Sequence, residues 1–280
     1  MGTEPYCLTT EMSTTDPRQP RARFPDSREI RARLRVAQRA SILLWAGALL
    51  SWLTHADRAL FERIAATPAL QALRPFGDLY SDWGLFLFYL PFLALLALGM
   101  WKRRATFTTT ARAYLLAQAF GTVLLVRLIK LVTARPRPLA DPLHDAFFQI
   151  TGFAEAIHST FPSSHAVDAM VGAVFVAVLV RSRATAVAAL AAALLMAVSR
   201  VLIGKHYLSD VLAGLALGTG IVSVAMHVYL LPRWQRFEAR RIRRTSDSSA
   251  PRLAFTQRLI QRRPPAAPIQ VHAERHGNQK

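Results

Sequence analysis

Cysteine and acidic residues are scarce in this chain of 280 residues. The single cysteine, Cys7, lies in a polar N-terminal stretch, which excludes an internal disulfide framework and a cysteine-based zinc site. There are 17 acidic residues against 35 lysines and arginines, so the formal net charge is +18. Such an excess occurs in nucleic-acid-binding proteins and in membrane proteins, and the positions of the charges distinguish the two classes.

The basic stretches of this chain are separated by long uncharged runs. Hydrophobic residues make up 52% of the chain and the mean hydropathy is +0.23, both high for a soluble protein. A helix of about 20 apolar residues crosses a bilayer, and no other open element satisfies its backbone in lipid. The sequence therefore predicts an all-α polytopic membrane protein, and nucleic acid is not an expected partner. Its six expected spans are 40–56, 83–101, 113–132, 164–180, 184–203 and 208–231.

The positions of the basic residues predict the topology. Residues 1–39, 102–112, 181–183 and 232–280 carry 26 of the 35 basic residues, and six spans place these four regions on one side. The positive-inside rule makes that side the cytoplasm. We expect a membrane domain at 40–231 between two basic cytoplasmic tails, 1–39 and 232–280. The first tail is expected to be poorly ordered, and Arg28 to Arg39 within it is an alternative candidate for a membrane-surface helix.

Three polar clusters lie at the ends of apolar segments on the side opposite the tails. Polar groups near membrane spans are costly, so they mark candidate functional sites. Because the topology places all three at one membrane face, we expect them to form one site. The clusters are Lys130 with Arg137 and Pro138; Ser163 with Ser164 and His165; and Ser199 with Arg200, His206 and Asp210.

These side chains suit a phosphate group. Guanidinium groups bind phosphate through two hydrogen bonds, and the N–H groups at the start of a helix point at anions. His206 and Asp210 are four residues apart, so on one helix they would share a face and touch, which would orient the imidazole as a nucleophile. His165, from another helix, is then free to protonate the leaving oxygen. A metal site formed by the two histidines and Asp210 is disfavoured, because the three nearby cations would repel a divalent metal ion.

The motifs K-x6-RP, PSSH and SR-x5-H-x3-D resemble those of the type 2 phosphatidic acid phosphatase superfamily. The second motif departs from the family at Ser164, where glycine is usual. The resemblance implies a metal-independent and cofactor-free mechanism through a phosphohistidine on His206, with His165 as general acid. It also implies that the phosphate is held by Lys130, Arg137, Ser163, Arg200 and the amide of Ser164.

Hydrolysis of a phosphomonoester or diphosphate on a membrane lipid is the expected function. The candidate substrates are phosphatidic acid, phosphatidylglycerol phosphate, undecaprenyl diphosphate and lipid A. Phosphoryl transfer between two lipids through the same intermediate is the alternative, and a non-catalytic lipid-phosphate binder is less consistent with the intact motifs. The expected location is the bacterial inner membrane, with the site at the periplasmic face.

Overall fold

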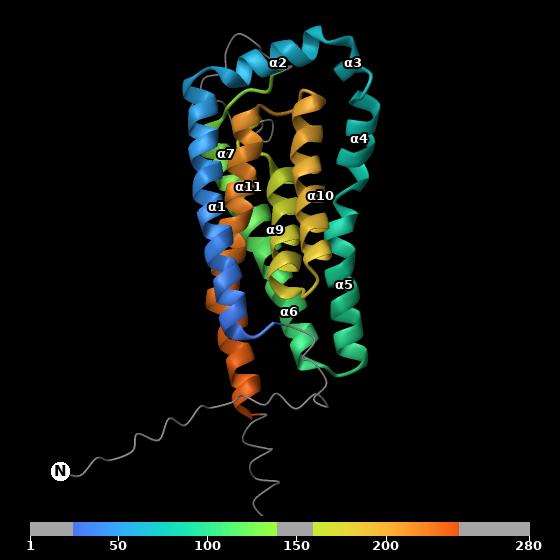
Figure 1. Ribbon diagram of the computed structural model, residues 1–280, viewed down its shortest axis with the longest axis vertical. Helices are drawn as coiled ribbons and strands as arrows, with labels where there is room; N and C mark the ends of the chain where they lie inside the picture. Colours follow the sequence, from blue (N-terminus) through green and yellow to red (C-terminus); the bar gives the residue numbers. More distant parts are fainter. Residues whose placement is uncertain (1–24, 139–158, 241–280) are drawn as a thin grey trace, which may run out of the picture. The chain divides into compact units, whose positions relative to one another are not determined.

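The computed structural model describes residues 25–138 and 159–240. Within these ranges the chain is helical and contains no strand, so the prediction of an all-α protein is confirmed. The chain divides into two units, Met1–Pro232 and Arg233–Lys280, and residues 233–240 of the second unit are helical. The elements of the first unit are α1 (Ser27–Leu53), α2 (Ala56–Ala66), α3 (Pro68–Gln71), α4 (Arg74–Trp83), α5 (Phe86–Trp101), α6 (Ala105–Leu116), the π-helical η1 (Ala117–Leu125), α7 (Val126–Thr133), α9 (Ser164–Leu179), α10 (Arg183–Leu202), α11 (Leu208–Val224) and the π-helical η2 (Ala225–Leu230) (Figure 1).

Helix α1 begins earlier than the sequence pattern suggests. The expected first span starts at residue 40, but the helix starts at Ser27, where the Asp26 side chain accepts hydrogen bonds from two backbone N–H groups. Ile30 and Leu34 are fully buried, so this first part of the helix packs within the protein. Residues 1–24 of the expected tail lie outside the described ranges.

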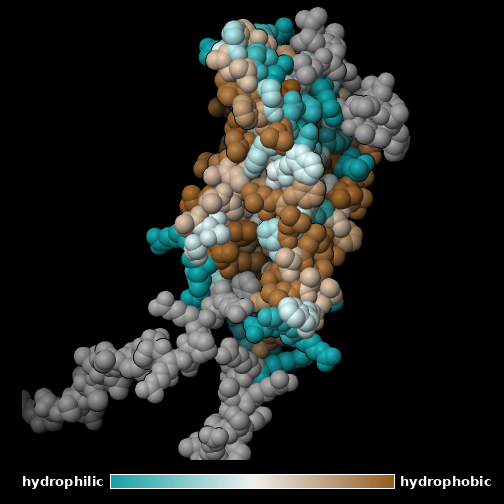
Figure 2. Space-filling view, turned by 90° about the vertical axis from the view of Figure 1, so that its right-hand side faces the viewer, coloured by the Kyte–Doolittle hydropathy of each residue, from teal (hydrophilic) through white to brown (hydrophobic). Residues whose placement is uncertain are grey.

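Five helices in the described ranges are long and apolar enough to cross a membrane. They are Ser27–Leu53, Pro68–Trp101, Ala105–Thr133, Arg183–Leu202 and the helix that begins at Leu208. The helix at the remaining expected span, 164–180, is Ser164–Leu179, which is apolar but has only 16 residues. The number of six spans therefore stays a prediction. Figure 2 shows hydrophobic side chains over much of the middle of one face, with hydrophilic ones gathered towards both ends.

Helix α9 lies at the centre of the first unit. Eleven of its 16 residues are buried, and it packs against both α10 and α11, while α1 packs along α11. Glycines on α11 allow the closest approach to α9. A Cβ atom at Gly214 would lie 2.8 Å from the carbonyl oxygen of Ser163, and one at Gly218 would lie 2.8 Å from that of Val167. These small residues hold the start of α9 against the start of α11.

The helices α2 and α3 lie across one end of the bundle in Figure 1. The chain reverses between α1 and α2 at His55, which has a positive φ of 56°. The reversal places Asp57, on the first turn of α2, in the interior with 1% of its surface exposed. The buried carboxylate of Asp57 therefore lies at the end of the bundle where α11 starts. It accepts a hydrogen bond from the N–H of Ser209 on the first turn of α11.

Candidate functional site

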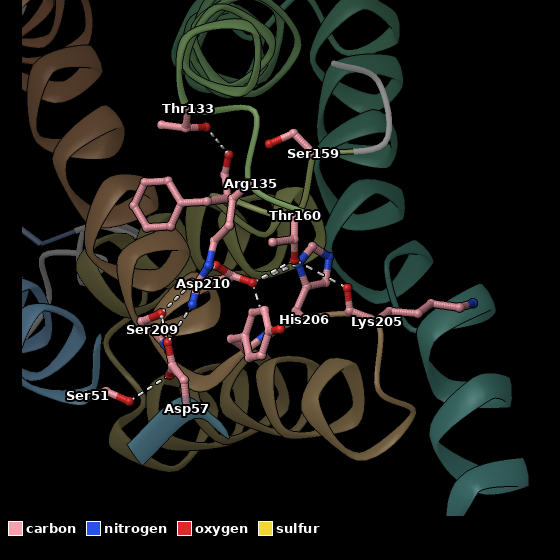
Figure 3. Close-up of polar contacts among 12 residues, drawn as sticks. Ser51, Asp57, Thr133, Arg135, Ser159, Thr160, Lys205, His206, Ser209 and Asp210 are labelled. Carbon is pink, nitrogen blue, oxygen red and sulfur yellow. Dashed lines mark hydrogen bonds and ion pairs between the residues drawn. The ribbon is translucent and has the colours of Figure 1, made fainter. Parts of the chain in front are cut away.

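Backbone and side-chain hydrogen bonds bring the three polar clusters together. The N–H of Ser163 donates to the carbonyl of Asp210 (3.1 Å), which joins the second cluster to the third. The N–H of Thr160 donates to the carbonyl of Arg135 (2.8 Å), and Thr133 Oγ1 donates to the carbonyl of Phe161 (3.1 Å). These two bonds join the first cluster to the second (Figure 3). One end of the bundle therefore carries residues from all three motifs, as expected from the topology.

His206 lies in the turn between α10 and α11, rather than on a helix. The turn contains Gly204 with a φ of 74°, and α11 begins two residues after the histidine. Asp210 is on the first turn of α11, where its Oδ2 accepts from the N–H of Tyr207 (2.8 Å) and so caps the helix. The expected placement of His206 and Asp210 on one helical face is therefore wrong, although the two side chains are still neighbours.

A hydroxyl group connects the two side chains. His206 Nδ1 is 3.7 Å from Asp210 Oδ2, beyond hydrogen-bond distance. Thr160 Oγ1 lies 2.9 Å from that nitrogen and 2.6 Å from that oxygen. An ionised carboxylate only accepts hydrogen bonds, so the single proton of Thr160 points at Asp210. His206 Nδ1 then has to donate to Thr160, which leaves Nε2 of the neutral ring with a free lone pair.

The surroundings of His206 favour its neutral form. Only 4% of the residue is exposed, and this burial is the main cause that lowers the pKa of His206 to about 4. Asp210 opposes the shift, whereas the charges of Arg200 and Lys130 add to it. An uncharged imidazole with Nε2 unprotonated is the form that attacks an electrophile.

Two of the three predicted cations, Lys130 and Arg200, act on both histidines. Lys130 Nζ donates to the carbonyl of Ser159 (2.6 Å). Arg200 is 5% exposed and its guanidinium donates to the hydroxyl of Ser81 on α4. The charge of Arg137 acts on both Lys130 and Arg200, so the three cations share one electrostatic environment. Lys205 is directed away from His206 in Figure 3 and lies 3.8 Å from Asp78.

The start of α9 supplies the remaining groups expected to bind an anion. Ser163 is the N-cap, and its hydroxyl is buried without a hydrogen-bond partner among the described residues. Ser164 is the first helical residue and is not among the described residues with positive φ, so its N–H is presented as that of glycine would be. His165 follows, and the charges of Arg200, Lys205 and Lys130 all act on it. All eight predicted site residues thus lie at one end of the bundle.

Four residues of this site are not among those predicted from the sequence: Asp57, Arg135, Thr160 and Ser209. Thr160 was not singled out, and Arg135 is one of the variable positions of the first motif. Arg135 is fully buried and forms ion pairs with Asp210 (2.7 Å) and with Asp57 (2.9 Å). Ser209 contacts both Asp57 and Arg135. The RPR sequence is the local signal that could have indicated these residues. Its two arginines each need an anionic partner, and a single phosphate need not serve both.

Asp168 is an acidic residue within the expected span 164–180. Asp168 interacts with Tyr89 and Thr122, and not with His165. The loop residues His144, Asp145, Glu155 and His158, which the sequence suggests are solvated, lie outside the described ranges. Within the described part of the chain, no group of three His, Cys, Asp or Glu side chains comes together as metal ligands.

Comparisons with known proteins agree with this geometry. The profile of the PAP2 superfamily matches residues 108–234, which contain all three motifs. The lipid A 1-phosphatase of Rhizobium etli (strain ATCC 51251 / DSM 11541 / JCM 21823 / NBRC 15573 / CFN 42) is 36% identical over 166 residues, which cover 56% of this chain and 69% of that protein. This chain belongs to the PAP2 superfamily.

A second curated relative and one solved structure are also similar to this chain. The lipid A 1-phosphatase of Rhizobium johnstonii (strain DSM 114642 / LMG 32736 / 3841) is 34% identical over 156 residues, which cover 53% of this chain and 62% of that protein. The crystal structure of a transmembrane PAP2 type phosphatidylglycerolphosphate phosphatase from Bacillus subtilis superposes with a TM-score of 0.44. It is 19% identical, and the match covers 70% of this chain and 94% of that one. With its apolar helices, this PAP2 superfamily member is an integral membrane protein.

Proposed function

We propose that this chain hydrolyses a phosphomonoester or diphosphate of a membrane lipid through a phosphohistidine on Nε2 of His206. Membership of the PAP2 superfamily and the two lipid A 1-phosphatase relatives support a membrane lipid phosphatase. The observation that carries the mechanism is the contact of Thr160 with both His206 and Asp210, because it leaves Nε2 as the unprotonated ring nitrogen.

The phosphate is bound by the cations and by the start of α9. Lys130, Arg137 and Arg200 neutralise the phosphate oxygens, and charge-assisted hydrogen bonds to them are the strongest available to a protein. The buried hydroxyl of Ser163 and the N–H of Ser164 complete the binding site. The same groups stabilise the transition state, in which charge spreads over the equatorial oxygens.

The reaction proceeds in two steps. Nε2 of His206 attacks phosphorus, a P–N bond forms, and the bond from phosphorus to the lipid oxygen breaks while His165 gives that oxygen a proton. A water molecule then attacks the phosphoryl group, His165 takes a proton from it, and the P–N bond breaks to release phosphate and neutral His206. Asp210 stabilises the positive ring that exists between the two steps. No metal ion takes part in this scheme.

The substrate is a lipid phosphate held in the bilayer by its chains. The names of the two Rhizobium relatives favour lipid A within the set of candidates given by the sequence. The basic residues of 1–39, 102–112, 181–183 and 232–280 support cytoplasmic termini and an opposite, periplasmic site in the inner membrane.

A panel of lipid phosphates assayed with purified protein in detergent tests the function. We expect phosphate release by the wild type, none by His206→Ala, and full activity for His227→Ala as a matched control. The ring of His227 bonds to the backbone of its own helix, at the carbonyl of Ser223. Wild-type release no faster than that of His206→Ala would contradict the proposal. Radiolabel from the substrate should appear as free phosphate, and its appearance in a second lipid would show phosphotransfer instead.

A further inference from the structure

Asp57 is a buried carboxylate that none of the three motifs contains. It lies on the first turn of α2, outside the residues matched by the superfamily profile. Its Oδ1 accepts from Ser51 Oγ (2.7 Å) and from the N–H of Ser209 (2.8 Å). Its Oδ2 accepts from Arg135 NH2 (2.9 Å), with both side chains fully buried. Figure 3 shows the continuous series of contacts from Ser51 through Asp57 and Arg135 to Asp210.

Arg135 connects this carboxylate to the one beside His206. Its NH1 donates to Asp210 Oδ1 (2.7 Å) and to Ser209 Oγ (2.7 Å), and its guanidinium lies 4.2 Å from the centre of the Tyr207 ring. One guanidinium is therefore shared by two carboxylates. In a buried site such close charges interact strongly, because little water screens them.

The charge balance of this group bears on catalysis. Among the described residues, two carboxylates and one guanidinium meet here and carry a net negative charge, which acts on His206 through Asp210. Without the charge of Asp57, Arg135 would cancel that of Asp210, and the positive ring formed during phosphoryl transfer would lose its stabilisation. In the proposed site the phosphate is bound by Lys130 and Arg200 and not by Arg135, so its binding would change little.

We propose that Asp57 is a positioning residue for the reaction, which neutralises Arg135 so that Asp210 keeps its charge for His206. The inference rests on the proposed function, because it assumes His206 as nucleophile. It makes Asp57 on the second helix, which lies outside the segment that carries the three motifs, part of the catalytic charge balance. It also explains why a buried arginine is tolerated next to a histidine that has to become positive.

The test uses kcat and KM measured separately in detergent. Asp57→Asn should lower kcat by about tenfold or more and change KM by less than about threefold, because the charge is needed in the transition state rather than in substrate binding. Asp57→Glu should recover part of the lost kcat. Glu62→Gln is the matched control, since Glu62 is an exposed carboxylate on the same helix, paired with Arg58, and it should behave as the wild type.

The double variant Asp57→Asn with Arg135→Gln separates charge balance from a structural role. In the double variant Arg135 no longer offsets the charge of Asp210. The kcat of the double variant should therefore exceed that of Asp57→Asn at least about threefold and approach the wild type. A double variant no more active than Asp57→Asn, or an Asp57→Asn variant with unchanged kcat, would overturn the inference. If Asp57→Asn does not fold, the kcat of the double variant is compared with that of the wild type. A kcat more than about tenfold below the wild type then overturns the inference. An active wild type with inactive His206→Ala shows in the same assay that the proposed function still stands.

Discussion

Asp210 approaches His206 without touching it: its Oδ2 lies 3.7 Å from Nδ1, and the hydroxyl of Thr160 lies between the two groups. The carboxylate is also engaged by Arg135 and by the N–H of Tyr207. The orientation of the histidine therefore depends on a threonine outside the defining motif positions, while the carboxylate is also fixed by Arg135 and by the backbone before its own helix.

Replacing Thr160 should impair the chemical step. Thr160→Val keeps the volume but removes the hydroxyl, so Nδ1 loses its acceptor and both ring tautomers become accessible. We expect kcat to fall about 10- to 100-fold, within the range for groups that orient a catalytic histidine. Thr160→Ser keeps the hydroxyl and should stay close to the wild type. Steady-state rates of phosphate release check both, and equal rates for Thr160→Val and the wild type would show that the hydroxyl does not matter.

The pH dependence should report the buried state of His206. The nucleophile works in its neutral form, which exists above its pKa, and burial lowers that pKa to about 4. The rate should therefore hold as the pH falls from 7 to about 5 and drop only near 4, whereas an ordinary histidine would lose activity from about 6.5. The measurement is kcat/KM against pH, corrected for ionisation of the substrate phosphate near about 6. A corrected acid limb near 6.5 would contradict the prediction.

Gly214 should not tolerate even a methyl group. The added Cβ would lie 2.8 Å from the carbonyl of Ser163 and 3.0 Å from Ala166 Cβ. Gly214→Ala should destabilise the protein by about 1–3 kcal/mol and raise KM, because it displaces the start of α9. Gly220 has no described atom within 4 Å of its ideal Cβ, so Gly220→Ala should be neutral or stabilise the helix by about 0.5–1 kcal/mol. Thermal unfolding in detergent compares the two, and equal midpoints would contradict this account of the helix contact.

Ser164 should be interchangeable with the glycine usual at that position. The residue starts a helix without a positive φ, so nothing in its backbone requires glycine. Ser164→Gly should leave kcat and KM within about twofold of the wild type. Ser163→Ala removes a buried hydroxyl and should raise KM about tenfold, as for a lost hydrogen bond to a charged group. A large effect of Ser164→Gly would instead assign a role to the serine hydroxyl.

The helical fold and the positions of the three motifs at helix ends could be predicted because their signals are local. Apolar runs of span length identify membrane helices, and the three motifs each sit at the end of such a run. One helix limit could not be read in this way. The start of α1 at Ser27 depends on the burial of Ile30 and Leu34 inside the protein, which no hydropathy window detects in a basic stretch.

The contacts of the site depend on residues far apart in the sequence. Asp57 and Arg135 are separated by 78 residues, and an acidic residue after an apolar segment is common. The sequence also does not show which arginine of the RPR pair meets phosphate and which meets a carboxylate. The turn at Gly204 decides that His206 precedes α11, so the i, i+4 rule for helices does not apply to it and Asp210.

The shortness of α9 has a consequence for how a substrate arrives. Its 16 residues extend over about 24 Å, less than the roughly 30 Å of a hydrocarbon core, and its flanks are covered by other helices. A lipid whose phosphate meets Ser163 and His165 at the end of this helix can keep its chains among the surrounding acyl chains. For a lipid phosphatase, such a substrate would reach the site by lateral diffusion within the leaflet, rather than by extraction of the whole lipid into water.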